Sequence, residues 1–185
     1  MVVGTSCSGK TTLARRIARA LDIPHVELDA LYWGPDWSEC PIEEFRESVR
    51  QRVGAERWVV DGNYAKVRDI VLARATDAVW LNYPFPVVFW RSLLRTSKRV
   101  ASGEELFGGN RETFGSAFLS RYSIPWWVIQ THHRRGRAYR ELFGSGAASH
   151  IRLTELRRQR DADELVGSIR SDGRCGRALD DLNSR

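Results

Sequence analysis

The sequence has few cysteines and no long apolar run. Its 185 residues include three cysteines, at positions 7, 40 and 175, which are far apart and form no C-x-x-C pair. This spacing excludes a disulfide framework and the common cysteine zinc sites, and it predicts a reduced, cytoplasmic protein. No stretch approaches the roughly 18 consecutive apolar residues that a membrane helix needs. The first apolar run stops at Gly4, too early for a secretory signal. We therefore expect no membrane partner.

The remaining composition is typical of a globular protein. Hydrophobic residues make up 42% of the chain and aromatic residues 10%, enough for a hydrophobic core. The length suits one domain, which we place at residues 1–170, and we expect the polar segment 171–185 to be a disordered tail. The net charge of +6 fits nucleic-acid binding, but it also fits arginines that bind a phosphorylated small ligand or that solvate the surface.

Apolar β-type runs alternate with segments of helical periodicity. The expected strands cover residues 1–3, 25–29, 57–62, 77–83 and 150–154, and the expected helices cover 10–21, 42–53, about 67–71, 87–100, 113–143 (broken near Pro125 and Gly136) and 161–169. Such alternation predicts an α/β fold with a parallel sheet of about five strands and helices on both faces. The first strand is short for a central strand, so we expect either a clipped strand or a true start a few codons upstream of Met1.

The segment GTSCSGKT, residues 4–11, fits the pattern G-x-x-x-x-G-K-[ST] and lies between an apolar strand end and an amphipathic helix. In this context the backbone N–H groups surround phosphate, Lys10 reaches the β- and γ-phosphates, and the hydroxyl of Thr11 binds Mg²⁺. The segment therefore predicts a site for ATP and Mg²⁺, in which Cys7 is a small loop filler. The predicted nucleotide-binding residues are Gly4, Thr5, Ser6, Cys7, Ser8, Gly9, Lys10, Thr11 and Thr12.

Two carboxylates follow predicted strands. Asp29 closes the segment HVELD and Asp61 closes WVVD, so both should lie at the carboxyl edge of the sheet, where ligands bind. We assign Asp61, with Thr11, to the metal shell and Asp29 to the acceptor side as a proton acceptor. The alternative is that each carboxylate only caps the next turn. Asn82, which ends the fourth strand, receives no metal role.

Arginines recur every four residues at positions 91, 95 and 99, along one helix face. Phosphoryl transfer is helped by cations that bind the transferring group, and lid segments commonly carry such cations. The alternative is that these arginines lie on a solvated helix surface. We assign Arg99 and Arg111, with Lys10 and Asp61, to catalysis. The predicted acceptor-binding residues are Asp29, Trp33, Arg68, Arg91 and Arg95.

Two groups of aromatic residues and one pair of histidines invite a role. Trp33 and Trp37 flank the turn GPDW and either stack on a planar substrate or pack in the core. The pair Trp126 and Trp127 is expected in the core. The segment THHRRGR, residues 131–137, is expected to be a basic surface turn without metal ligands.

The segments GTSCSGKTT, LDALYW, WVVDGNY, AVWLNYP and GGNRE occur in this order. Together they resemble the small P-loop proteins labelled DNA topology modulation proteins, which are similar to adenylate kinases. The resemblance implies a P-loop NTPase three-layer sandwich with strand order 2-3-1-4-5, a lid at about 99–113 and an acceptor region at about 30–60. It also implies transfer of the γ-phosphate of Mg-ATP to a small-molecule acceptor.

The chain departs from adenylate kinases at the acceptor. Those enzymes follow the Asp-Gly pair with Phe-Pro-Arg, whereas this chain has Asn63-Tyr64 and delays arginine to Arg68. Two alternatives to a small-molecule kinase remain open: a nucleotide-dependent regulator that binds DNA or a protein and affects DNA topology, and a polynucleotide 5′-hydroxyl kinase.

Overall fold

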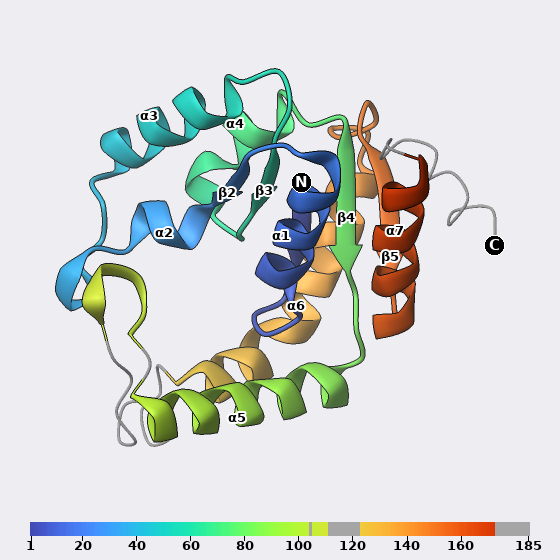
Figure 1. Cartoon of the computed structure of the whole chain (residues 1–185). Helices are drawn as coiled ribbons and strands as arrows, with labels where there is room; N and C mark the ends of the chain where they lie inside the picture. Colours follow the sequence, from blue (N-terminus) through green and yellow to red (C-terminus); the bar gives the residue numbers. More distant parts are fainter. Residues whose placement is uncertain (104, 111–122, 173–185) are drawn as a thin grey trace.

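The computed structural model describes residues 1–103, 105–110 and 123–172. Five parallel strands form one sheet in the order β2-β3-β1-β4-β5 (Figure 1). The strands are β1 (Val2–Gly4), β2 (His25–Glu27), β3 (Val59–Asp61), β4 (Asp77–Leu81) and β5 (Arg152–Leu156). The predicted α/β class and strand order are therefore confirmed, and β1 lies at the centre of the sheet.

The α-helices are α1 (Lys10–Leu21), α2 (Leu28–Tyr32), α3 (Ile42–Val53), α4 (Arg68–Leu72), α5 (Phe85–Ser102), α6 (Ile124–Gly144) and α7 (Gln159–Asp172). Short 3-10 helices occur at η1 (Pro35–Trp37), η2 (Ala65–Val67) and η3 (Phe107–Gly109). Helices α1 and α3 begin and end where their periodicity predicts. Within the part of the chain that the structure describes, no helix is long and apolar enough to cross a membrane.

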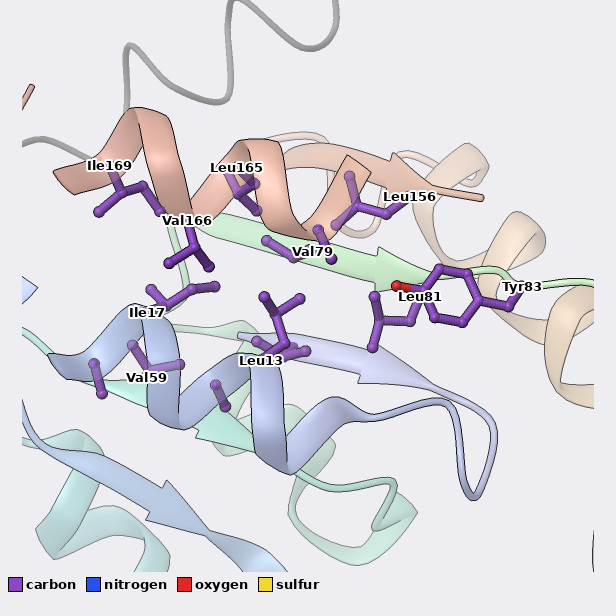
Figure 2. Close-up of a cluster of buried hydrophobic side chains, with 14 of the residues drawn as sticks. Leu13, Ile17, Val59, Val79, Leu81, Tyr83, Leu156, Leu165, Val166 and Ile169 are labelled. Carbon is purple, nitrogen blue, oxygen red and sulfur yellow. The ribbon is translucent and has the colours of Figure 1, made fainter. Parts of the chain in front are cut away.

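Helices cover both faces of the sheet because side chains alternate across each strand. On one face, Val79 and Leu81 pack with Leu13 of α1 and Leu165 of α7 (Figure 2). On the other face, Val60 packs with residues of α3 and α4, and Trp80 packs with Tyr139 of α6. This arrangement is consistent with a three-layer sandwich.

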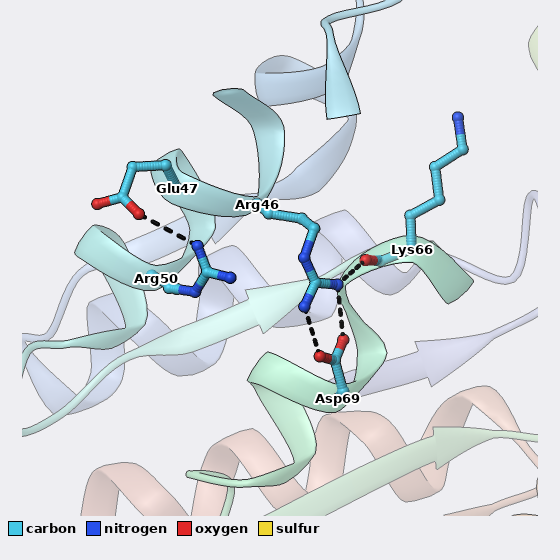
Figure 3. A network of polar contacts seen from close by, with 5 residues as sticks. All are labelled: Arg46, Glu47, Arg50, Lys66 and Asp69. Carbon is cyan, nitrogen blue, oxygen red and sulfur yellow. Dashed lines mark hydrogen bonds and ion pairs between the residues drawn. The ribbon is translucent and has the colours of Figure 1, made fainter. Parts of the chain in front are cut away.

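An ion pair fastens α3 to α4 at the edge of the second layer (Figure 3). Arg46 Nη1 and Nη2 donate to the two oxygens of Asp69 at 3.0 and 2.6 Å, and Nη1 also donates to the carbonyl of Lys66. A second pair, Arg50 with Glu47, lies within α3 alone.

Several boundaries differ from the predictions, among them the end of β2 and the course of α6. The strand β2 ends at Glu27, and Asp29 lies on the short helix α2. Helix α6 runs unbroken through Gly136, which is buried, while Pro125 occupies the first turn, where a missing N–H costs nothing.

The predicted roles of the α6 residues are also corrected. Trp126 and Trp127 are 45% and 38% exposed, not core residues, because the buried face of α6 carries Val128, Thr131 and His132 instead. His132 is buried, with Nε2 3.0 Å from the carbonyl of Tyr83, so it does not belong to a surface turn.

The predicted lid and tail fall partly outside the described residues. Residues 99–102 belong to α5, whereas residue 104 and residues 111–113, with Arg111, lie outside the described part of the chain. The last helix continues to Asp172, two residues beyond the predicted domain boundary. The rest of the predicted tail, 173–185, also lies outside it.

Candidate active site

The loop between β1 and α1 has the backbone that its glycines predict. Gly4 and Gly9 have φ values of 153° and 95°, in the region that favours glycine. Helix α1 has no side-chain cap and no acidic residue in its first turn. Its first N–H groups therefore remain without intrahelical acceptors and suit an anion.

Lys10 bends back over this loop. Its Nζ donates to the carbonyl of Thr5 at 2.8 Å, beside the hydroxyl of Ser8, which donates to the same carbonyl at 2.9 Å. Burial lowers the pKa of Lys10 to about 8, and the negative charges of Asp29 and Asp61 oppose that shift. The lysine is thus a poorly solvated cation, which an incoming anion would stabilise.

Asp61 connects the end of β3 to the loop. The Thr11 hydroxyl donates to Asp61 Oδ2 at 2.7 Å, and His25 Nε2 lies 2.7 Å from Oδ1. The carboxylate is 3% exposed, so both oxygens are held by partners in place of water. Sequence reasoning missed His25, because its place follows from the pairing of β2 with β3: it lies opposite Val59, and its side chain reaches Asp61 two residues further along.

A hydroxyl and a carboxylate are the hard oxygen donors that Mg²⁺ prefers, so Thr11 and Asp61 fit the predicted metal. Among the described residues, no group of three His, Cys, Asp or Glu side chains is placed to hold a metal ion. A metal bound here would therefore need further oxygen ligands from phosphate or water.

A cavity of about 780 Å³ opens beside the loop. It brings together residues from the loop, from the β2–α2 end of the sheet and from α5. The predicted site residues that line it are Ser6, Cys7, Gly9, Lys10, Thr11, Thr12, Asp29, Trp33, Arg91, Arg95 and Arg99.

Asp29 is fixed by a hydrogen bond from the neighbouring Tyr64. The Tyr64 hydroxyl donates to Asp29 Oδ1 at 2.6 Å, and burial, with the charge of Asp29, raises the pKa of Tyr64. The tyrosine therefore keeps its proton and remains a donor, which leaves the other oxygen of Asp29 for a ligand in the cavity.

The arginines of α5 turn toward the loop, and Figure 1 shows this helix lying below the loop before α1. Arg91 donates to the Ser8 carbonyl at 3.2 Å and to Gln159 Oε1 at 2.8 Å. Arg95 Nη1 lies 4.0 Å from Cys7 Sγ. Arg91 and Arg99 are partly buried and Arg95 is exposed, and all three line the large cavity.

A second cavity of about 260 Å³ lies on the other side of the loop. It is lined from the ends of β4 and α7, by residues that include Tyr83 and Gln159, and it shares Cys7, Gly9 and Arg91 with the larger cavity. Since β1 is central, the two cavities extend from the loop toward opposite edges of the sheet.

A third cavity, of about 420 Å³, lies at the amino ends of the strands, around Met1, Trp58 and Asp77. It contains none of the predicted site residues. Because ligands of open parallel sheets bind at the carboxyl ends of the strands, we do not place the active site there.

The structure separates Arg68 from the other predicted acceptor residues. Among the described residues, those lining the large cavity do not include Arg68, which lines a small cavity with Asn63 and Tyr139. Asn63 itself was missed by sequence reasoning: its Nδ2 donates to the Gly4 carbonyl at 2.6 Å, and its Oδ1 accepts from the Tyr139 hydroxyl. The glycine-rich loop is therefore braced from β3 and α6.

Arg135 is a second functional candidate that the sequence did not indicate. Its positive charge acts on Lys10 and lowers the pKa of that lysine. Burial lowers the pKa of Arg135 itself, and its guanidinium lies 5.8 Å from the centre of the Trp127 ring. Only the packing of α6 behind the loop reveals this cation. The signal in the sequence was a run of basic residues that also suits a surface turn.

No protein-family model, curated protein or solved structure matches the chain. The chemistry must therefore be argued from the geometry of its own residues.

Proposed function

We propose that the protein is an ATP- and Mg²⁺-dependent phosphotransferase that transfers the γ-phosphate of ATP to a small-molecule acceptor. The observation that carries the proposal is the hydrogen bond between Thr11 and Asp61, at 2.7 Å, beside Lys10 in a glycine-rich loop. A hydroxyl, a buried carboxylate and a lysine at the start of a helix are the groups that bind a metal–triphosphate.

The donor would occupy the loop and the smaller cavity. The N–H groups of the first turn of α1 and the Lys10 ammonium bind phosphate oxygens, while the space beside Tyr83 and Gln159 takes the nucleoside. Arg91, which spans both cavities, lies where it would contact the phosphate chain.

Mg²⁺ held by Thr11 and Asp61 would neutralise charge on the phosphate oxygens. The chain itself orients these two ligands: Asp61 accepts from Thr11 and is fixed on its other oxygen by His25.

The acceptor would lie in the large cavity, on the Asp29 side of Lys10. In the transfer step, the acceptor oxygen bonds to the γ-phosphorus, the bond from that phosphorus to the bridging oxygen breaks, and ADP leaves. The proton of the acceptor hydroxyl passes to Asp29. Arg95 and Arg99, which line the cavity, would supply positive charge for the transferring group.

The test is a transfer assay with Mg-ATP and a panel of nucleosides, mononucleotides, sugars and amino alcohols. We expect acceptor-dependent release of ADP that Lys10→Ala reduces by about 10²-fold or more. If no acceptor in a broad panel increases ADP release and Lys10→Ala equals the wild type, the proposal is wrong.

The two alternatives share the donor site and differ in what they contact. A DNA-binding regulator would bind duplex DNA with an affinity that falls steeply with salt, and a polynucleotide kinase would label 5′-hydroxyl ends. Because the arginines of α5 face the cavity, they favour a ligand of the cavity over a nucleic acid along the helix surface.

A further inference from the structure

We infer that the acceptor is a hydroxyl compound without a phosphate group, neutral or carrying a protonated amine, and with a flat face. This inference rests on the proposed function, because it names the substrate class of the same site. It departs from a nucleoside monophosphate, which an adenylate-kinase-like enzyme would take.

The β2–α2 end of the cavity carries negative charge. Glu27 and Asp29 line this end. The cation beside them, Arg15, forms an ion pair with Glu27 at 2.6 Å. A phosphate dianion placed here would face carboxylates of its own sign, which is unfavourable in a partly enclosed site.

Several of the other cations point toward the phosphate-binding loop. Arg91 donates to the loop and to Gln159, and Arg95 lies at Cys7. Arg68 lines the small cavity behind the loop. Among the described residues, Arg91 and Arg95 thus lie at the phosphate-binding loop, Arg99 lines the cavity from α5, and Arg15 at the β2–α2 end is paired with Glu27.

A phosphate acceptor and a hydroxyl acceptor differ in their need for a base. The phosphate oxygen of a mononucleotide is already ionised, so its attack on phosphorus needs no base. A hydroxyl must lose its proton as the new bond forms. Asp29 supplies that proton acceptor: it lines the cavity together with Lys10, and Tyr64 fixes one of its oxygens.

Two tryptophans form an aromatic wall of the cavity. Trp33 and Trp37 both line the cavity, with ring centres 5.9 Å apart and planes at 82° to each other. Trp37 is 40% exposed, so one ring face is available to a ligand. An indole face binds flat rings and ammonium groups, and it offers nothing to a phosphate.

The experiment uses the full chain, Mg-ATP and matched pairs of acceptors with and without phosphate: adenosine and AMP, thymidine and TMP, glucosamine and glucosamine 6-phosphate. We expect at least one unphosphorylated member to be phosphorylated, with kcat/KM at least 10²-fold above its partner. The monophosphates should not compete in equilibrium binding followed by tryptophan fluorescence.

Variants separate the acceptor end from the donor end. Asp29→Asn should lower kcat by about 10²- to 10³-fold, while Mg-ATP still binds. Trp33→Ala should raise the acceptor KM about tenfold, whereas Trp33→Phe should restore most of it.

The possible failures are distinct. If a monophosphate is the better acceptor, or if Asp29→Asn leaves kcat for a hydroxyl acceptor unchanged, this inference is overturned while the phosphotransferase stands. If Mg-ATP does not bind, and no member of any pair releases ADP, the proposed function itself is overturned.

Discussion

The side-chain amide of Asn110 donates a hydrogen bond to the carbonyl oxygen of Gly34 at 2.9 Å. The amide oxygen of the same side chain accepts from the N–H of Trp37 at 3.0 Å. One residue from the segment after α5 therefore holds the turn that carries both tryptophans of the cavity.

Replacing Asn110 should loosen this turn. Each hydrogen bond contributes about 1 kcal/mol, so Asn110→Ala should raise the acceptor KM about tenfold. Asn110→Asp keeps the acceptor for Trp37 N and loses the donor to Gly34, so its effect should be intermediate. The measurement is steady-state kinetics, with Gln51→Ala on the surface of α3 as a control. Equal KM values for Asn110→Ala and the control would contradict the prediction.

Lys10 should make nucleotide binding dependent on pH. Its pKa of about 8 lies below the ordinary value of 10.5, and a bound triphosphate would raise it again. Binding should then take up about half a proton at pH 8 and almost none at pH 6.5, and the affinity should fall as the pH rises above 8. Calorimetry in HEPES and in Tris measures the uptake. Lys10→Arg, which stays charged, should abolish it, and an unchanged uptake in that variant would contradict the prediction.

The same shift has a consequence for stability in the absence of ligand. Since the folded pKa is below the unfolded one, the unfolded chain binds more protons between pH 8 and 10.5. The contribution of Lys10 to the free energy of unfolding should therefore rise with pH in that window. Lys10→Met should remove this slope in urea denaturation curves recorded from pH 7.5 to 10.

Thr11 should contribute to Mg-ATP binding through its hydroxyl group rather than through the volume of its side chain. Thr11→Val removes the hydroxyl that donates to Asp61 and should weaken Mg-ATP binding about 10- to 100-fold. Binding of ATP in excess EDTA should be equal in both proteins, and Thr11→Ser should behave like the wild type. A variant that loses ATP binding with and without Mg²⁺ alike would argue against a metal ligand here.

Gly62 is required by its position behind α2. A Cβ at this residue would lie 2.6 Å from Leu28 Cβ, and its φ is 138°. Gly62→Ala should therefore reduce the free energy of unfolding by about 1–3 kcal/mol. Gly167→Ala in α7, where a Cβ meets nothing within 4 Å, should instead stabilise by about 0.4–1 kcal/mol. Denaturant unfolding compares the two, and destabilisation by both would show that the contact with Leu28 is not the cause.

The ion pair between α3 and α4 should contribute to the dependence of stability on pH in the acidic range. Arg46 lowers the pKa of Asp69, so the pair stabilises the protein above the ordinary Asp pKa of 3.8 and loses its effect as the pH falls below it. Arg46→Ala should lower the Tm slightly at pH 7, less so in 1 M salt. The matched variant Arg50→Ala, whose partner lies on the same helix, should change Tm less. The same Tm for both variants would contradict a special role for Arg46.

Local patterns were enough for much of the fold. The period of apolar residues fixed the bounds of α1 and α3, and the alternation of strands and helices predicted a parallel sheet with two covered faces. The position of Asp61 followed from its place at the end of an apolar run. These features depend on neighbours in the sequence, which is why they were predictable.

Contacts between distant segments were not predictable in this way. His25 meets Asp61 only through strand register, and Arg135 reaches the neighbourhood of Lys10 only because α6 packs behind the loop. The sequence also placed Arg68 with the acceptor by its distance from Asp61, whereas the turn through η2 directs it to another cavity. Each of these positions is set by packing, which one sequence does not encode locally.

The donor half and the acceptor half of the site lie on different kinds of secondary structure. The donor half lies on β1, β3 and the twelve-residue helix α1, while the acceptor half lies on the five-residue helix α2 and the three-residue turn η1. Residues 33–40 contain no buried side chain and can therefore be exchanged with less effect on the core than α2, whose Leu28 and Tyr32 are buried. Swapping that segment between related chains is a direct route to new substrate preferences on an unchanged ATP-binding frame.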